Sequence, residues 1–346
     1  MDWTAPNRLL IDGDAVVANW RTLARMSGRA ACGAAVKANG YGLGARDVAT
    51  RLVAAGCRDL FVATWGEARA LGDVGPATVG VLHGIRDEDA TQIGLPGVRP
   101  VLNTVNQVRR WRAIGGGACD VMVDTGMNRL GLSVQDVADG VLDGLAIETL
   151  MSHLACADDD HPLNARQRAA FAGLAGQTSA RRLSLANSAG IALGPEYAFD
   201  LTRPGLALYG GVPRGELADL IRPVVGIEAQ ILQRRAVRAG ETVGYNATWT
   251  AQRDTAVAIV NLGYADGYWR GFSGRGMARG PAGEALPVIG RVSMDLVALD
   301  LSAAPRLSEG AWVSLDYALP EASGASGMSQ YELLTGLGHR FERIVR

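Results

Sequence analysis

The sequence contains a single lysine, Lys37, because 33 of its 34 basic residues are arginines. Arginine supplies charge but stays protonated in proteins, whereas a lysine amine can attack a carbonyl group and hold a Schiff base. Isolated lysines are usually solvent-exposed surface residues. This one follows the apolar run at residues 34–36 and precedes the glycine-rich stretch at 39–44, a pattern that predicts the C-terminal end of a strand. Lys37 is therefore the first candidate for a reactive group.

Two turn-like stretches could hold an anion near such an amine. Ser188 offers a hydroxyl group within residues 186–190, and Gly205 allows close backbone approach within residues 203–206. Each stretch taken alone is typical of an ordinary turn. Together with Lys37 they indicate a phosphorylated aldehyde cofactor, whose aldehyde would meet the lysine and whose phosphate would meet the two loops.

The elements that must position these residues alternate between apolar runs and helical segments. Strands are predicted at residues 34–36, 59–63, 78–82, 99–102, 119–123, 147–152, 182–186 and 206–209. Helices are predicted at 45–55, 65–71, 104–114, 133–142 and 164–176. This alternation predicts an α/β fold, a (β/α)8 TIM-type barrel, in which the loops after the seventh and eighth strands commonly bind phosphate. The alternative, an open doubly wound sheet, would need a Gly-x-Gly-x-x-Gly turn that the sequence lacks.

The pattern of predicted elements changes from alternating strands and helices to mostly strands after about Ile221. Strands are predicted at residues 224–232, 255–260, 287–292, 297–301 and 311–315, and one helix at 329–337. We therefore expect a barrel domain at 1–221 and a mostly β C-terminal domain at 222–346. Residues before about 12, including Leu9–Ile11, could add a strand to the second domain.

Composition narrows the class of protein. A formal net charge of −1 gives no support for a nucleic-acid or membrane partner, and 48% hydrophobic with 20% charged residues is an ordinary globular balance. The N-terminus lacks the basic flank and apolar core of a signal peptide, and no run of 18 apolar residues occurs, so a cytoplasmic location is expected. The four cysteines and four histidines show no metal-ligand spacing, so no metal is expected.

The ordered motifs of the chain resemble those of the bacterial alanine racemases over nearly its whole length. Residues 35–42, AVKANGYG, look like the family's pyridoxal 5'-phosphate attachment motif. Similar motifs follow in the family's order at residues 124–131, 152–155, 186–188, 203–210, 244–248, 263–267 and 290–295. The resemblance implies a homodimeric isomerase that interconverts L-alanine and D-alanine and supplies D-alanine for peptidoglycan.

The resemblance also implies two catalytic bases. Lys37 would hold pyridoxal phosphate and act as the base on the D-alanine face, and Tyr245 of the other subunit would serve the L-alanine face. Two bases are needed because a proton removed from one face of the α-carbon must be returned to the other. Tyrosine normally titrates near 10, so His153 and Arg203 are expected to activate it.

The remaining expected contacts divide between cofactor and substrate. Arg203 would donate to the pyridine nitrogen and, because a guanidinium cannot accept, would keep that nitrogen unprotonated. The other residues expected to bind the cofactor are Tyr41, Arg129, His153, Asn187, Ser188, Gly205 and Leu206. The residues expected to bind the amino-acid substrate are Arg129, Met294, Asp295 and Tyr264.

One position departs from the family pattern. Many members carry a lysine at the position of Met122 and carbamylate it to orient the arginine equivalent to Arg129. Methionine cannot do this, so we expect a neighbouring acid or a bound anion such as chloride to orient Arg129. For the C-terminal phosphate contact of the family, neither Tyr331 nor His339 is assigned.

Three alternative functions remain open at this stage. A serine or broad-specificity racemase would need a pocket that differs by one oxygen, worth only about 1–3 kcal/mol in an apolar site. A pyridoxal phosphate decarboxylase of similar architecture typically uses a cysteine of the β domain, yet the last cysteine here is Cys156. A non-catalytic pyridoxal phosphate carrier usually lacks the second domain that this chain is expected to have.

Overall fold

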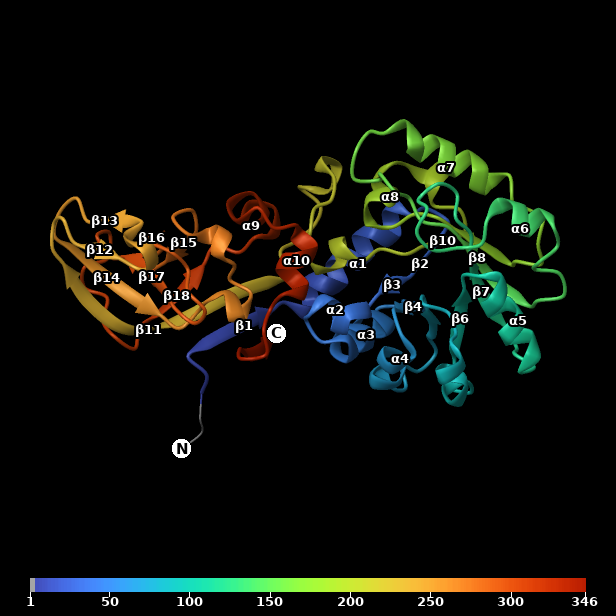
Figure 1. Ribbon diagram of the computed structural model, residues 1–346, viewed down its shortest axis with the longest axis horizontal. Helices are drawn as coiled ribbons and strands as arrows, with labels where there is room; N and C mark the ends of the chain where they lie inside the picture. Colours follow the sequence, from blue (N-terminus) through green and yellow to red (C-terminus); the bar gives the residue numbers. More distant parts are fainter. Residues whose placement is uncertain (1–3) are drawn as a thin grey trace. The chain divides into compact units, whose positions relative to one another are not determined.

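The computed structural model describes residues 4–346 and divides the chain into two compact units. One unit comprises Val16–Arg222, and the other joins the N-terminal residues up to Ala15 to Pro223–Arg346. The two units are described separately (Figure 1). No helix in residues 4–346 is long and apolar enough to cross a bilayer.

Seven parallel strands form one continuous sheet in the first unit (Figure 1). They run in the order β3 (Ala34–Ala35), β4 (Asp59–Val62), β5 (Thr78–Val81), β6 (Val98–Leu102), β7 (Cys119–Met122), β8 (Ile147–Met151) and β9 (Arg182–Ser184). All seven coincide with predicted strands to within two residues at either end. Their side chains are mostly buried, as expected for a parallel sheet covered on both faces.

An eighth strand, β10 (Leu201–Thr202), closes the ring of strands. It pairs in parallel with β2 (Ala31–Cys32), just before β3. On its other side, backbone hydrogen bonds of 2.8 Å from Arg203 N to Ala186 O and of 3.0 Å from Asp200 N to Leu183 O link it to β9. The barrel prediction is therefore confirmed.

The position predicted for the eighth strand is wrong. Leu206–Tyr209 forms a 3-10 helix, η3, and all four of its residues are buried. A short apolar run without periodicity has the same sequence pattern in a buried strand and a buried helix, so the pattern could not separate the two.

Helices begin after most strands at residues that cap them. Thr64 and Thr104 accept hydrogen bonds from Glu67 N and Gln107 N at the starts of α4 (Trp65–Leu71) and α5 (Val105–Ala113). The other helices of this unit are α1 (Gly13–Met26, which begins in the other unit), α2 (Lys37–Tyr41), α3 (Ala45–Ala54), α6 (Val134–Ala138), α7 (Pro162–Ala172) and α8 (Ser188–Ala192). The predicted helix at 133–142 is shorter because the chain turns at Gly140, whose φ is +75°.

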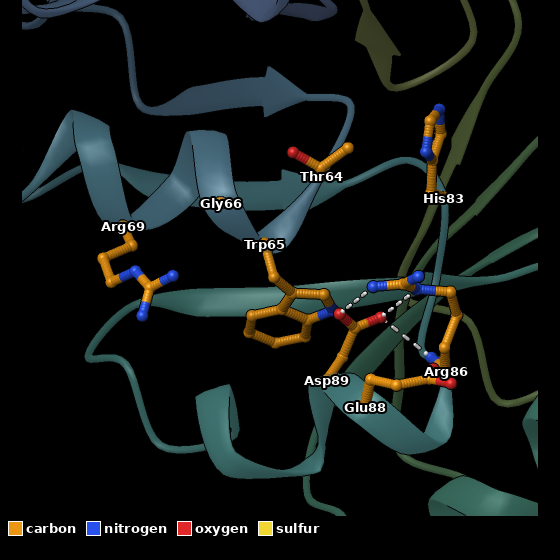
Figure 2. A pocket seen from close by; sticks show the side chains of 8 residues that line it. All are labelled: Thr64, Trp65, Gly66, Arg69, His83, Arg86, Glu88 and Asp89. Carbon is orange, nitrogen blue, oxygen red and sulfur yellow. Dashed lines mark hydrogen bonds and ion pairs between the residues drawn. The ribbon is translucent and has the colours of Figure 1, made fainter.

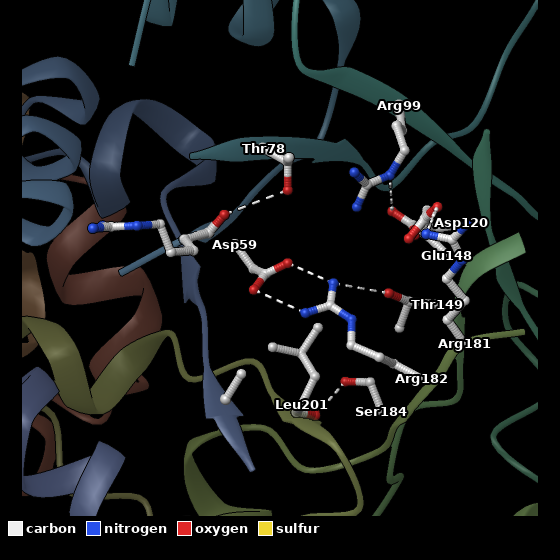
Figure 3. Close-up of polar contacts among 12 residues, drawn as sticks. Asp59, Thr78, Arg99, Asp120, Glu148, Thr149, Arg181, Arg182, Ser184 and Leu201 are labelled. Carbon is white, nitrogen blue, oxygen red and sulfur yellow. Dashed lines mark hydrogen bonds and ion pairs between the residues drawn. The ribbon is translucent and has the colours of Figure 1, made fainter. Parts of the chain in front are cut away.

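Charged side chains from the N-terminal ends of the strands meet inside the barrel (Figure 3). Arg182 donates to both carboxylate oxygens of Asp59, at 2.6 and 3.1 Å, and to Thr149 at 3.3 Å. Arg99 lies 3.5 Å from Asp120, a carboxylate that is 1% exposed. Burial raises the pKa of Asp120. This layer therefore lies opposite the C-terminal ends of the strands, where Lys37 and the predicted phosphate loops are located.

The second unit is built on a mostly antiparallel sheet. Its strand order is β14 (Thr255–Val260), β17 (Val297–Asp300), β16 (Ala285–Ile289), β15 (Met277–Arg279), β18 (Trp312–Leu315), β11 (Val225–Val237), β1 (Asn7–Ile11) and β19 (Glu342–Val345). The long strand β11 also pairs with β14, which curls the sheet onto itself. A two-stranded ribbon, β12 (Thr242–Val243) with β13 (Trp249–Thr250), extends from it.

Two helices complete this unit. The helix predicted at 329–337 is present as α10 (Gln330–Thr335) and begins at a Ser329 cap. A second helix, α9 (Leu319–Ser326), was not predicted from the sequence. Its segment contains a proline, a glycine and two serines, which individually favour turns. Pro320 stands in the first turn, where its missing N–H costs nothing.

Candidate active site

Lys37 lies directly beyond the C-terminal end of β3 and begins an unusual backbone turn. Ala38, Asn39 and Gly40 have φ/ψ near +52/+47°, +52/+48° and +64/+45°, which are the angles of a left-handed helix. Tyr41 continues it with φ of +53°. L-residues avoid this conformation at about 1–2 kcal/mol each, so the surrounding structure must hold it.

The turn brings Tyr41 against the second predicted phosphate loop. The ring of Tyr41 is buried and stacks on Tyr209 with a centroid distance of 4.6 Å. Tyr209 in turn donates from its hydroxyl to the carbonyl of Ala35 at 2.9 Å. A Cβ atom at Gly205 would stand only 2.2 Å from the Tyr41 hydroxyl oxygen. Only glycine therefore allows the backbone and this hydroxyl to approach each other.

Ser188 joins the two predicted loops. Its Oγ accepts hydrogen bonds from the backbone N–H groups of Gly205 at 2.9 Å and Ala207 at 3.2 Å. Asn187 caps α8 by accepting from Gly190 N at 2.8 Å, which orients the loop. Leu206, next to Gly205, is buried. The predicted phosphate residues are thus gathered around one corner of the barrel.

Arg203 is a buried cation, and among residues 4–346 no carboxylate accepts a hydrogen bond from it. The residue is 7% exposed, and its Nη2 donates to the Ser152 carbonyl at 2.6 Å while Nη1 donates to the Ser184 hydroxyl. Burial lowers the pKa of Arg203 to about 10, and the charge of Asp120 opposes that shift. A charged donor that bonds to neutral oxygens, here those of Ser152 and Ser184, suits a neutral acceptor such as a pyridine nitrogen.

Four basic groups share this end of the barrel. Burial, followed by the charges of Arg203, Arg129 and Lys37, lowers the pKa of His153 to about 3, so its imidazole is neutral. Burial and Arg129 also lower the pKa of Lys37, while Glu67 raises it. Because positive neighbours lower the pKa of both Lys37 and His153, an anion near these two groups would be favoured.

The contact between Arg129 and a nearby acid is made by the backbone N–H of Arg129 and not by its guanidinium. The carboxylate of Asp124 accepts the N–H groups of Gly126, Met127 and Arg129 at 2.8, 2.9 and 3.0 Å. Within residues 4–346, no acid lies in ion-pair range of the Arg129 guanidinium, and the residue as a whole is exposed. Met122, on β7, is buried. The neighbouring acid expected to orient Arg129 is therefore not found, whereas the anion alternative stays a prediction.

Three of the residues predicted to bind substrate lie together in the second unit. Tyr264 N donates to the Ser293 carbonyl at 3.1 Å, and the next residue donates to the Met294 carbonyl at 3.0 Å, so the two loops are paired. Met294 is 54% exposed. The carboxylate of Asp295 accepts from Arg340 at 2.6 Å and is therefore engaged within its own unit.

Tyr245 stands at the tip of the β12–β13 ribbon. It begins a tight turn in which Asn246 and Ala247 have φ of +61° and +47°. The preceding Gly244 lies against the backbone of Arg291, so the turn borders the loop that leads to Met294. The side chain is exposed, at 67% for the residue. Tyr245 thus projects from its unit rather than packing into the core.

A separate polar pocket opens beyond β4 and β5 (Figure 2). Its volume is about 520 Å³, and it is lined by Thr64, Trp65, Gly66, Arg69, His83, Arg86, Glu88 and Asp89. Arg86 and Asp89 form a bidentate ion pair at its edge, with contacts of 3.0 and 2.9 Å. The lining includes none of the predicted site residues, so this pocket is distinct from the Lys37 site.

Several residues that shape the site were not predicted. Glu67 and Asp124 accept backbone N–H groups beside Lys37 and Arg129, and Arg340 binds Asp266 at 2.7 and 2.9 Å behind Tyr264. A Thr64-x-x-Glu67 pattern signals a helix start, and Asp124 before Thr-Gly signals a turn. Neither signal shows which distant backbone the carboxylate will reach.

Fold and site together define a class: a (β/α)8 barrel with a half-buried lysine beyond its first strand, a corner where Ser188 meets Gly205, and a following β unit. The sequence pattern of the alanine racemase N-terminal domain matches residues 11–213, and that of the alanine racemase C-terminal domain matches residues 224–345. The chain belongs to the alanine racemase family.

Individual relatives agree over the full length. The chain is 42% identical to the alanine racemase of Acidiphilium cryptum across 98% of both chains. It is 41% identical to the biosynthetic and the catabolic alanine racemases of Agrobacterium fabrum, covering 98% of this chain and 93% and 92% of theirs. The crystal structure of Bartonella henselae alanine racemase with covalently bound pyridoxal phosphate superposes with a TM-score of 0.90 at 35% identity, covering 99% and 100% of the two chains.

Proposed function

We propose that this protein interconverts L-alanine and D-alanine with pyridoxal 5'-phosphate as its cofactor. The observation that carries the proposal is the placement of the only lysine of the chain. Lys37 stands at the end of a barrel strand, with a lowered pKa, at the same end as the corner where Ser188 accepts the N–H of Gly205, two residues far away in the sequence. Membership of the alanine racemase family supports the same reaction.

The residues at this end of the barrel fit the cofactor. Tyr41, Ser188, Gly205 and Leu206 would hold its phosphate, and Arg203 would donate to its ring nitrogen. A side chain at position 205 would clash with the Tyr41 hydroxyl. The glycine therefore lets the backbone come close to this hydroxyl, and a backbone that binds a phosphate through its N–H groups needs such a close approach. When bound to an amino acid, pyridoxal phosphate withdraws electrons and so acidifies the hydrogen on the α-carbon.

Lys37 and Tyr245 would then exchange protons with opposite faces of that carbon. The lowered pKa of Lys37 raises the fraction of neutral amine that can accept a proton. In this proposal Tyr245 comes from a second copy of the chain, and its exposure, with that of Met294, supports a homodimer with shared sites. Residues 222–346 would thus complete the site of the partner subunit.

His153 and Arg203 would prepare the tyrosine for this role. His153 is neutral because burial and the neighbouring positive charges oppose its protonation. Its imidazole can therefore pass a hydrogen bond between Arg203 and a phenol without adding a charge. Arg129 would address the substrate carboxylate, and Met294 with Tyr264 would limit the size of the pocket.

Two narrower questions belong to the same proposal. Family membership favours alanine over serine as the substrate. The two amino acids differ by a single oxygen, so an apolar pocket alone would discriminate between them only weakly. The equal identity to a biosynthetic and a catabolic relative does not separate the two physiological roles. We propose supply of D-alanine for peptidoglycan in the cytoplasm.

The test is exchange of the α-hydrogen of each alanine enantiomer in deuterated water. Wild type is compared with Lys37→Ala and Tyr245→Phe in the presence of pyridoxal phosphate. Each variant is expected to lose exchange preferentially from one enantiomer, and Lys37→Ala also loses covalent attachment of the cofactor. Full interconversion of the enantiomers by Lys37→Ala would refute the proposal. The same assay with serine measures specificity.

A further inference from the structure

Glu67 connects the ends of two neighbouring barrel strands. Strands β3 and β4 pair directly, with Ala35 opposite Phe61. Lys37 follows the first strand, and α4 with Glu67 follows the second. One carboxylate oxygen of Glu67 accepts the N–H of Ala38 at 2.8 Å, and the other accepts the N–H of Ala63 at 2.6 Å. A single side chain therefore bridges the backbone next to Lys37 and the backbone after β4.

This contact falls where the left-handed turn begins. The later N–H groups of the turn bond to nearby carbonyls, from Gly40 to Val36 at 2.9 Å and from Gly42 to Ala38 at 2.8 Å. The N–H of Ala38 instead has Glu67 as its acceptor. Because alanine has no intrinsic preference for the left-handed region, this external bond helps to compensate a conformation that costs about 1–2 kcal/mol per L-residue.

The charge of Glu67 also differs from that of the other groups around Lys37. Besides burial, the charge of Arg129 lowers the pKa of Lys37, and the charges of Arg203, Arg129 and Lys37 lower the pKa of His153. Burial and Arg129 lower the pKa of Lys37, and Glu67 is the acid that raises it. The carboxylate is thus the negative charge that opposes the positive neighbours.

We propose that Glu67 is a positioning residue for Lys37, because its carboxylate fixes the turn that begins at Ala38 and supplies a negative charge next to that turn. This role of Glu67 rests on the proposed function in one respect, namely that Lys37 is the reactive amine. Geometry and charge are separable contributions, and two substitutions divide them. Glu67→Gln removes the charge but keeps one oxygen as an acceptor. Glu67→Asp keeps the charge but is one methylene too short to span both N–H groups.

The charge is tested by titrating Lys37 itself. Because the chain has one lysine, lysine carrying an NMR-active nitrogen at Nζ gives a single side-chain signal in the full-length protein without added cofactor. We expect Glu67→Gln to shift the titration midpoint to lower pH by about half a unit or more. Glu67→Asp should stay closer to wild type. Glu332→Gln is the matched control, since Glu332 occupies the same third helical position in α10 and accepts from Ser329 N at 2.9 Å.

The geometry is tested by hydrogen exchange at the Ala38 amide. Both Glu67 variants are expected to exchange faster there than wild type and than Glu332→Gln, with Glu67→Asp affected most. If Glu67 merely begins α4, both variants lower the melting temperature while the Lys37 midpoint and the Ala38 exchange rate stay unchanged, and the proposal is overturned. These readouts need no cofactor, so they remain informative even if pyridoxal phosphate fails to bind, an outcome that would contradict the proposed function instead.

Discussion

His153 makes the protein less stable in acid by an amount that can be calculated. Burial and the charges of Arg203, Arg129 and Lys37 lower the pKa of His153 from 6.5 to about 3 in the folded chain. Between these values the unfolded chain binds a proton that the folded chain does not, so stability falls as pH drops below 6.5. At about 1.4 kcal/mol per unit, the loss from this group is about 2 kcal/mol at pH 5 and nearly absent at pH 7.

The assay is urea unfolding of the full chain, without cofactor, at both pH values. For wild type and for His153→Asn, the unfolding free energy at pH 5 is subtracted from that at pH 7. The two losses of unfolding free energy are then compared. His153→Asn should lose about 2 kcal/mol less than wild type on acidification. His83→Asn serves as the control, because His83 is exposed and its backbone, through its N–H to Ala63 and its carbonyl to Gln107, makes hydrogen bonds that the substitution retains.

Two results would contradict this reasoning. Equal acid lability of wild type and His153→Asn would mean that His153 is protonated in the folded chain. An imidazole titration followed by NMR with a midpoint near 6.5 would say the same directly. Either result would also remove the neutral relay proposed between Arg203 and Tyr245.

Further predictions concern the phosphate corner, the barrel interior and the substrate loops. Gly205→Ala should weaken retention of pyridoxal phosphate in a dialysis assay, because the new Cβ would meet the Tyr41 hydroxyl at 2.2 Å; unchanged retention would argue against a phosphate there. Asp59→Asn should cost about 3 kcal/mol in denaturant unfolding, since it leaves the Arg182 guanidinium without its paired carboxylate. Arg340→Met should cost about 2 kcal/mol or more and raise KM for alanine, because it removes the charged partner of the fully buried Asp266, two residues after Tyr264. Arg279→Met, which breaks the exposed pair with Asp316, should leave both the melting temperature and KM close to wild type.

Much of the fold could be predicted because its signals are local. Apolar runs bounded by glycines marked seven barrel strands, and the contrast between lysine and arginine usage singled out Lys37. The eighth strand was misplaced because β10 is only two residues long, whereas the more apolar 206–209 segment is a buried 3-10 helix. Helix α9 was missed because its stability comes from packing rather than from its residue preferences.

The sequence by itself determined which chemical groups are available: one titratable amine, a hydroxyl and glycines in turns, and arginines where a permanent donor is needed. These properties depend on residue type alone and not on the folded structure. Only the tertiary structure decided their protonation and geometry. The neutral state of His153, the burial of Arg203 and the left-handed turn held by Glu67 all arise from contacts between residues far apart in the chain. Such contacts depend on desolvation and on which backbone groups meet, and neither can be read from neighbouring residues.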